Sequence, residues 1–257
     1  DFVERLFTAS THDYLLFFTN RGKVYWQKVY DLPQLARGAM GRPIVNMLSL
    51  AQEERISSVI NVSGPFDDRE VIMATRQGTI KKTKLSSFNR PMRTGIIAIG
   101  LEEGDALIGV ELTDGKREVM LGTRHGQSIR FRESEVRSMG RQAAGVGGIG
   151  LEPGDEVVDL LIVQEHGCVL TACENGHGKR TAFSEYRLQG RNGSGIINIR
   201  TTERNGRVVG MKAVSEDDDI MFMSTEGMVI RMAVKDISSF GRNTQGVRLI
   251  SLSNTDR

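Results

Sequence analysis

One pattern occurs five times along this chain, at a spacing of about 50 residues. Each copy is anchored by a glycine that ends a short turn, and these glycines are Gly22, Gly78, Gly126, Gly176 and Gly227. An arginine stands fifteen residues after each of them, at Arg37, Arg93, Arg141, Arg191 and Arg242. A sequence that repeats at a fixed period of this length predicts a repeat architecture, in which each unit packs against its neighbours.

Each copy predicts four β-strands. A mostly apolar run precedes the glycine, as in residues 119–123, and an alternating run follows it, as in residues 129–132. A loop rich in Gly and Arg then leads to a third run (residues 96–99, 196–199 and 247–250) and a closing run (residues 54–62, 104–113, 154–163 and 205–214). Because no stretch shows a sustained helical period, we expect an all-β fold of four-stranded units, which is the sequence form of a propeller.

The turn before each glycine predicts a β-hairpin. Asn175-Gly176 is the strongest of these signals, because both central residues of a two-residue turn must tolerate positive φ.

Residues 1–257 are expected to form a single repeat domain. Residues 1–10 resemble the closing strand of a preceding unit, whereas the fifth copy stops where its own closing strand should begin. In a ring of repeats, the two ends of the chain would close on one another.

Composition places the chain among ordinary globular proteins, with 39% hydrophobic and 26% charged residues and a net charge of +2. No run approaches the roughly 20 apolar residues of a membrane helix, and residues 1–6 show no signal peptide. The two cysteines, Cys168 and Cys173, lie in one strand-like run and give no disulfide framework. We therefore expect a cytoplasmic protein with no membrane partner.

No motif indicates catalysis or a metal site. Residues 145–150 match G-x-G-x-x-G, but a turn follows them instead of the helix that a dinucleotide site needs. The four histidines lie in different repeats, and none stands near an Asp or Cys at a metal-ligand spacing. We expect no catalytic residue and no metal ligand in this chain.

Basic residues recur at fixed places in the repeat. Four residues after the glycine, four of the five copies carry a cation, at Lys82, Arg130, Arg180 and Arg231. Further candidates for a basic surface are Lys28, Arg42, Lys81, Lys84, Arg132 and Lys179. The arginines fifteen residues after each glycine have two interpretations: guanidinium clamps on loop carbonyls, or phosphate ligands assisted by nearby glycine N–H groups.

Equivalent residues of successive repeats lie along one rim in a ring, and a rim of spaced cations suits a bent polyanion. Bending duplex DNA through a large angle costs several kcal/mol, roughly 1–6 kcal/mol for a site of 20–30 bp. Many phosphate contacts along an arc offset this cost better than one pocket does. Such binding is expected to be independent of DNA sequence and strongly dependent on salt.

Several separate runs resemble the C-terminal domain of the bacterial DNA gyrase A subunit, and the resemblance extends from Asp1 to Arg257. They are residues 38–46 (Gly-Ala-Met-Gly-Arg-Pro-Ile-Val-Asn), 178–181 (Gly-Lys-Arg-Thr), 202–206 (Thr-Glu-Arg-Asn-Gly) and 241–247 (Gly-Arg-Asn-Thr-Gln-Gly-Val). The resemblance implies a β-pinwheel, a propeller-like disc of usually six blades whose outer strands are exchanged between neighbours. It also implies that the disc wraps duplex DNA around its rim, which gives gyrase the chirality for ATP-dependent negative supercoiling.

The same resemblance implies that this domain is not an enzyme on its own and holds no cofactor. The ATP site, the Mg²⁺ site and the catalytic tyrosine of the holoenzyme belong to other domains. The expected protein partners are the gyrase B subunit and the rest of the gyrase A subunit, in an A2B2 assembly in the bacterial cytoplasm.

The chain departs from the family in one respect, because the hallmark heptapeptide Gln-Arg-Arg-Gly-Gly-Lys-Gly is absent. We expect it upstream, in a preceding unit. Without it, the related C-terminal domain of the topoisomerase IV A subunit stays an alternative. A propeller that serves as a protein-interaction scaffold is a further alternative, but one Trp, four Tyr and a repeated cation argue against it.

Overall fold

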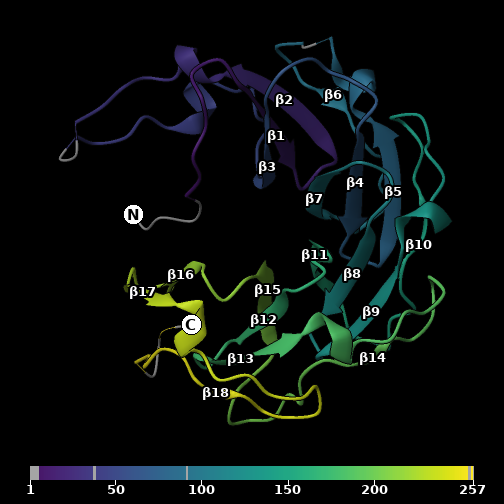
Figure 1. The fold of residues 1–257 in the computed structure, drawn as a ribbon. Coiled ribbons are helices and arrows are strands. Elements are labelled where there is room, and N and C mark those ends of the chain that lie inside the picture. Colours follow the sequence, from purple (N-terminus) through teal and green to yellow (C-terminus); the bar gives the residue numbers. More distant parts are fainter. Residues whose placement is uncertain (1–5, 37–38, 91, 254–255, 257) are drawn as a thin grey trace. The chain divides into compact units, whose positions relative to one another are not determined.

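A computed structural model describes residues 6–36, 39–90, 92–253 and 256. The chain forms two compact units. The first consists of residues 8–115 and 136–146, and the second contains residues 116–135 and the chain from residue 147 onward. The fold is all-β, as the sequence predicts: the described residues form four four-stranded antiparallel sheets and one two-stranded sheet (Figure 1).

Each repeat begins with an antiparallel hairpin whose two strands flank the repeat glycine. In the first four repeats these pairs are β1 (Tyr14–Thr19) with β2 (Lys23–Lys28), β4 (Glu70–Thr75) with β5 (Thr79–Lys84), β8 (Glu118–Thr123) with β9 (Gln127–Arg132), and β12 (Cys168–Cys173) with β13 (His177–Ala182). A short 3₁₀ helix follows each second strand: Val29–Asp31, Leu85–Phe88, Glu133–Glu135, Phe183–Glu185 and, in the fifth repeat, Val234–Asp236.

The hairpin turns differ from the two-residue type that the sequence predicts. The N–H of Gly176 donates to the carbonyl of Cys173 at 3.1 Å, so three residues make the turn. Gly176 has φ +70, whereas Asn175 is not among the described non-glycine residues with positive φ. This is a turn that ends with a left-handed glycine. The prediction of positive φ at both residues was wrong because a three-residue loop needs the left-handed conformation only at its last residue. The Asn175 side chain donates through Nδ2 to the Glu203 carbonyl at 3.0 Å.

A closing strand from the same repeat pairs with the first strand of each of these four hairpins. These strands are β3 (Ile56–Val62), β7 (Leu107–Thr113), β11 (Val157–Ile162) and β15 (Val208–Val214). Within each unit the closing strands contact one another, β3 with β7 and β11 with β15. The predicted closing runs are therefore confirmed in position, and they form one edge of each sheet.

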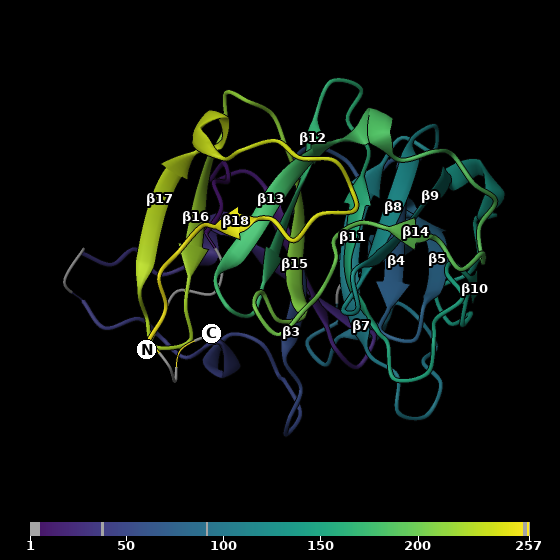
Figure 2. The ribbon, with the colours of Figure 1, turned by 90° about the horizontal axis from the view of Figure 1, so that it is seen from below.

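The opposite edge of each sheet is supplied by the next repeat. The sheet orders are β3-β1-β2-β6, β10-β5-β4-β7, β11-β8-β9-β14 and β15-β12-β13-β18, where β6 is Ile96–Ile97, β10 is Val146–Gly147, β14 is Ile196–Ile197 and β18 is Val247–Arg248. Figure 2 shows β18 beside β13, which confirms the strand exchange implied by the family resemblance.

Each exchanged strand has only two residues, which is shorter than the sequence predicts. The residues after it turn away to cover the glycine of the preceding hairpin. Ala98, Asn198 and Leu249 each donate a backbone N–H to a repeat glycine carbonyl at 2.8 Å. A Cβ on Gly176 would lie 2.4 Å from the Ile250 carbonyl oxygen. The repeat glycine is therefore required by its φ and by the next repeat, which packs directly on it.

Among the described residues, the sheet of the fifth repeat consists of its hairpin alone. This hairpin pairs β16 (Asp219–Met223) with β17 (Val229–Ala233). In the first repeat, the third-strand position holds a 3₁₀ turn, Ile44–Asn46. Residues 6–10 of the predicted closing strand form no strand, because the chain turns between Ser10 and Asp13 before β1. Residues 1–5 lie outside the described part.

The cores lie where the sheets of successive repeats pack. In the first unit, Leu16 and Phe18 of the first repeat pack with Val71 and Met73 of the second. In the second unit, Met120 of the third repeat packs with Val169 and Phe183 of the fourth, and Leu170 packs with Val234 of the fifth. Successive repeats therefore share much of the core, as in other repeat proteins. The first repeat also has a cluster of its own, which Leu15, Phe17, Tyr25 and Leu48 form.

Candidate nucleic-acid interface

Two of the expected DNA-binding lysines are fully buried. Lys81 and Lys179 stand three residues after their repeat glycines, and neither side chain is exposed. The Lys81 ammonium donates to the carbonyls of Ala98, at 2.7 Å, and of Arg141. The Lys179 ammonium donates to the carbonyls of Gly241 and Arg242, both at 2.6 Å. Because no phosphate can reach these ammonium groups, the expectation that they contact DNA directly does not fit the structure.

Burial of these amines has an electrostatic consequence. It lowers the pKa of Lys81 to about 8, and the charge of Arg141 adds to the shift. Burial likewise lowers the pKa of Lys179 to about 8, with a further contribution from Arg242. Three other repeats carry Tyr25, Ile129 and Ile230 at this position. The apolar character of these equivalents was the signal that the lysines face inward.

The cations four residues after the glycine face the next repeat instead of a solvent rim. Arg130 donates through Nη1 to the carbonyls of Phe183, at 2.7 Å, and Tyr186, at 3.1 Å. Arg180 donates through Nε to the carbonyl of Ile237 at 2.6 Å. Lys82 is buried at the equivalent place, where it forms a parallel β-bridge with Ser138. In the part of the chain that the structure describes, these three residues join consecutive repeats, and their role as phosphate ligands stays a prediction.

Arg231 has a different environment. It is exposed, and it forms an ion pair with Asp219 on the neighbouring strand of its own hairpin. It is the residue of the fifth repeat at the fourth position after the repeat glycine, and the described part of the chain places no further repeat over it.

The arginines fifteen residues after the glycine act as carbonyl clamps. Arg141 donates through Nη1 to Ile97 O at 3.0 Å, Arg191 to Gly147 O at 3.0 Å and Arg242 to Ile197 O at 2.9 Å. Each guanidinium thus holds the exchanged strand of the repeat before it. These bonds confirm the clamp interpretation for the three arginines, and each of these residues is half-buried. Arg93 is exposed, and Arg37 lies outside the described residues.

The remaining predicted cations lie nearer to solvent. Arg42 and Arg132 are exposed, and Lys84 is exposed while paired with Asp68 at 3.2 Å. Lys28 is half-buried with its ammonium over the rings of Tyr14, at 5.6 Å, and Tyr30, at 5.2 Å. Its hydrogen bond to the Tyr30 hydroxyl raises the pKa of Lys28 above its usual value.

A second set of exposed arginines, which the sequence reasoning missed, lies on the loops and exchanged segments. The first unit carries Arg90 and Arg137, and the second carries Arg187, Arg200 and Arg248. Arg137 and Arg187 both stand eleven residues after a repeat glycine, and this recurrence was a readable signal. Arg200 and Arg248, like Arg93, lie on an exchanged strand or within a few residues of one, at the edge of a sheet.

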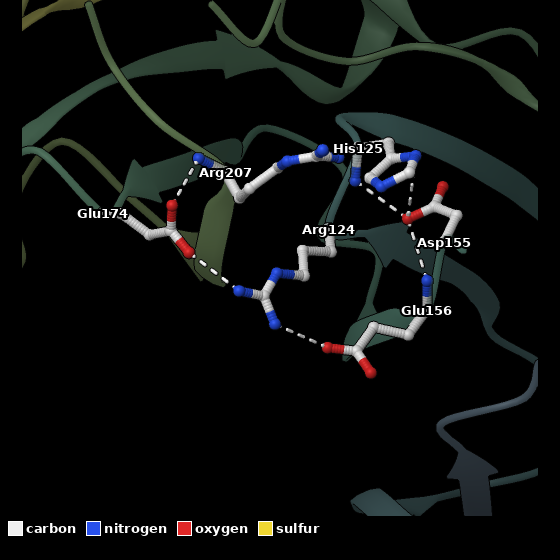
Figure 3. A network of polar contacts seen from close by, with 6 residues as sticks. All are labelled: Arg124, His125, Asp155, Glu156, Glu174 and Arg207. Carbon is white, nitrogen blue, oxygen red and sulfur yellow. Dashed lines mark hydrogen bonds and ion pairs between the residues drawn. The ribbon is translucent and has the colours of Figure 1, made fainter. Parts of the chain in front are cut away.

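A network of acids and bases occupies the hairpin-turn end of the third and fourth repeats (Figure 3). Arg124 donates to Glu156 at 3.0 Å and to Glu174 at 2.9 Å. These hydrogen bonds raise the pKa of Arg124 above its usual value, and the bond that Arg124 donates to Glu156 has the largest effect. The network borders a hollow of about 500 Å³ that is lined by His125, Glu174, Thr201, Thr202, Glu203, Gly206 and Arg207. Glu156 and Glu174 thus pair with Arg124, so its charge is balanced within the protein.

The aspartate in this network recurs at the start of the closing segments. Asp155 accepts the backbone N–H of His125 at 2.8 Å, Asp105 that of Gln77 at 2.9 Å and Asp256 that of Glu226 at 2.9 Å. Each carboxylate therefore ties a hairpin turn to the segment that closes the same repeat. Asp105 and Asp155 lie within the closing runs predicted from the sequence, which did not indicate this structural role.

Other kinds of site are absent from the described residues. No group of three or more His, Cys, Asp or Glu side chains among them is placed to hold a metal ion. No helix in the described part is long and apolar enough to cross a membrane.

Hairpin repeats that are completed by a strand from the next repeat, as in the first four repeats, define a propeller-type repeat domain. Comparison with known proteins is more specific. A sequence model described as "DNA gyrase C-terminal domain, beta-propeller" matches residues 13–63, 69–114, 117–164, 169–215 and 218–257, one segment for each repeat. The chain belongs to this family, and its fold is the pinwheel of the gyrase A C-terminal domain.

Relatives in sequence are gyrase A subunits. The chain is 51% identical over 250 residues to the DNA gyrase A subunit of Salmonella typhimurium, a match that covers 97% of this chain and 28% of that protein. It is 57% identical over 253 residues to the DNA gyrase A subunit of Halalkalibacterium halodurans, covering 98% of this chain and 30% of that one. The chain thus spans less than a third of the length of these relatives.

Solved structures agree on the fold. The C-terminal domain of DNA topoisomerase IV matches with a TM-score of 0.85 and 28% identity, over 94% of this chain and 76% of that chain. The DNA gyrase A C-terminal domain matches with a TM-score of 0.84 and 28% identity, over 96% and 81%. Structure alone does not separate the two, but the family match and the sequence identities above place this chain with gyrase A.

Proposed function

We propose that this chain binds duplex DNA without regard to sequence and wraps it, and that wrapping gives gyrase its chirality in ATP-dependent negative supercoiling. The observation that carries the proposal is the set of exposed arginines on the loops and exchanged segments of both units, at Arg90, Arg93, Arg137, Arg187, Arg200 and Arg248. The membership of the gyrase A family supports the same function.

The distribution of free charge favours backbone contacts over base reading. Arg130 and Arg180 on the second strands donate to carbonyls of the next repeat, whereas the arginines on the loops and exchanged segments are exposed. Guanidinium groups bind phosphate oxygens bidentately, and contacts of this kind position DNA but carry no sequence information. The described part of the chain has no α-helix to enter a major groove.

In this proposal the domain is not an enzyme by itself. It works as part of the gyrase A subunit together with the B subunit, in the A2B2 assembly of the bacterial cytoplasm. ATP hydrolysis and DNA cleavage, with their cofactors, belong to the rest of that assembly. A topoisomerase IV subunit is the second candidate in structure, and the 51–57% identities to gyrase A subunits argue against it.

The salt dependence of binding tests this proposal. If the protein contacts ~6–10 phosphates, log K should fall against log salt with a slope of about −5 to −9. We expect Arg187→Gln, Arg200→Gln and Arg248→Gln together to make the slope less steep by about 2 to 3, since each lost phosphate contact removes roughly 0.9.

The matched control changes two exposed arginines at the hairpin-turn end, Arg204→Gln and Arg207→Gln, which should leave the slope as in the parent. A parent slope near −1, or a strong preference for one short DNA sequence, would contradict wrapping. Equal slopes for the parent and the triple variant would show that DNA lies elsewhere on the domain.

A further inference from the structure

Two exposed isoleucines occupy the same position on exchanged strands. Ile97 on β6 is 45% exposed and Ile197 on β14 is 39% exposed. The residue before each of them, Ile96 or Ile196, packs against a hydrophobic core. Alternation along a strand explains why the second side chain points away from the core. It does not explain why that side chain is apolar, because the equivalent residues of the other exchanged strands are Gly147 and Arg248.

An arginine of the next repeat binds the backbone carbonyl of each isoleucine. The guanidinium of Arg141 donates to Ile97 O at 3.0 Å, and that of Arg242 donates to Ile197 O at 2.9 Å. The backbone of each exposed isoleucine is therefore hydrogen-bonded to a half-buried arginine of the next repeat. Single exposed apolar residues are common on protein surfaces and need no explanation. An isoleucine that recurs at one repeat position, in both units and beside the same kind of clamp, is a built arrangement.

The repeat between them has the clamp without the apolar side chain. Arg191 donates to Gly147 O at 3.0 Å, just as Arg141 and Arg242 do at their sites. A Cβ on Gly147 would lie 2.3 Å from Oδ1 of Asn192, so the amide of Asn192 fills the space that a side chain would need. The clamp is therefore independent of the isoleucine. The third repeat provides an internal comparison in which the backbone arrangement is kept and the apolar side chain is missing.

We propose that Ile97 and Ile197 are wedges that press between base pairs of bound duplex DNA from the minor groove, while the neighbouring guanidinium groups bind the flanking phosphates. The proposal rests on the DNA-wrapping function proposed above. Apolar side chains that enter the minor groove partly unstack one base step and bend the duplex by about 20–90°. The exchanged strand, which the arginine holds through its carbonyl, suits this role, because little conformational freedom of the isoleucine is lost when DNA binds.

The wedge has a consequence for DNA sequence. Pyrimidine–purine steps unstack most easily, so the isoleucines should favour TA and CA steps at two points along the wrapped DNA. Phosphate contacts would still supply most of the affinity. Overall binding then remains nearly independent of sequence, although the positions of local bends do not.

The test uses the complete gyrase A protein that contains this chain, with the double variant Ile97→Ala and Ile197→Ala. Bending is measured by energy transfer between the ends of a labelled duplex, and unstacking by permanganate oxidation of thymines. We expect the parent to show thymines with reactivity several-fold above free duplex. The Ala variant should lose this excess and bend DNA less, with a Kd within about threefold of the parent.

Two further variants fix the interpretation. Ile97→Leu with Ile197→Leu keeps an apolar wedge, so it should retain the reactive thymines. Val209→Ala removes an exposed apolar side chain on β15, which is a closing strand, and should behave as the parent.

The wedge fails if the parent bends DNA without reactive thymines, or if the Ala double variant bends and unstacks DNA as the parent does. Those results would leave the wrapping function intact. A parent that neither bends DNA nor shows steep salt dependence would overturn the wrapping function and the wedge together.

Discussion

The fourth and fifth repeats carry the same sequence pattern in two different surroundings. Leu170 pairs with Arg180 across the hairpin of the fourth repeat, and Met221 pairs with Arg231 at the same register of the fifth. Leu170 is buried and the Arg180 side chain is 11% exposed, whereas the Arg231 side chain is 71% exposed. The fourth hairpin has a strand on both sides. The fifth has neither among the described residues.

This difference shows that a repeat position has no fixed role of its own. Arg180 binds the carbonyl of Ile237 because the fifth repeat brings that carbonyl to it. Arg231 has the same chemistry on the same kind of strand, but it meets only Asp219 of its own hairpin. Whether a cation joins repeats or remains available to an anion is decided by the neighbouring repeat.

The largest loss of folding stability is expected for a substitution of Gly176, the glycine on which the fifth repeat packs. Gly176→Val places a β-branched residue at φ +70, and its Cβ would lie 2.4 Å from the Ile250 carbonyl oxygen. Strain at such a residue costs about 1–3 kcal/mol, and the displaced carbonyl adds to this. We expect a loss of more than about 3 kcal/mol in the free energy of unfolding, measured by chemical denaturation.

The control for this variant is Gly241→Ala, in the loop of the fifth repeat. A Cβ at Gly241 meets nothing within 4 Å, so the change should be within about 0.5 kcal/mol of the parent. Equal stability of Gly176→Val and Gly241→Ala would show that the fifth repeat does not pack on this glycine.

An intermediate effect is expected for the two equivalent arginines. Arg180→Ala removes a charged donor at 2.6 Å from Ile237 O, and a hydrogen bond to a charged group contributes about 1.5–3 kcal/mol. Arg231→Ala removes an exposed ion pair and should cost within about 0.5 kcal/mol.

Thermal melts and chemical denaturation of the two variants measure this contrast directly. Arg180→Lys is the conservative comparison, and it should recover only part of the loss, because an ammonium cannot reproduce the planar guanidinium contacts. Similar losses for Arg180→Ala and Arg231→Ala would mean that the next repeat does not determine the role of this position.

The smallest effect concerns the buried lysine, which the fifth repeat replaces with Ile230. The folded pKa of Lys179 is about 8, below its ordinary value of 10.5, so above pH 8 the unfolded chain binds more protons than the folded chain. The free energy of unfolding should therefore rise with pH from about 8, by less than about 1.4 kcal/mol per pH unit for each such lysine. Lys81 should act in the same direction.

Other buried groups limit the range in which this rise is visible. Burial raises the pKa of Cys173 to about 12 from 9.0, and burial also raises the pKa of Tyr186, so these groups lower stability above about pH 9. Denaturation at pH 7, 8 and 9 isolates the lysine contribution. Lys179→Met keeps the apolar stem and should remove about half of the rise between pH 8 and 9, because Lys81 contributes the rest. An unchanged slope would show that Lys179 stays charged.

The sequence by itself determined the repeat, the hairpins and the all-β class. These features are local: alternation fixes strand faces, and the glycine after each turn supplies the left-handed residue that ends it. The closing runs also followed from the sequence, since each pairs with a hairpin of its own repeat. The family resemblance, rather than the periodicity, led to the exchange of outer strands.

Only the tertiary structure decided which cations remain free. Lys179 and Arg180 are adjacent basic residues on one strand, and their targets are carbonyls of residues 237, 241 and 242, about sixty residues later in the chain. Local pattern cannot show that a loop from the next repeat will supply unpaired carbonyls at that place. The physical reason is that a buried carbonyl needs a donor, and the nearest donors in this fold are the cations of the preceding repeat.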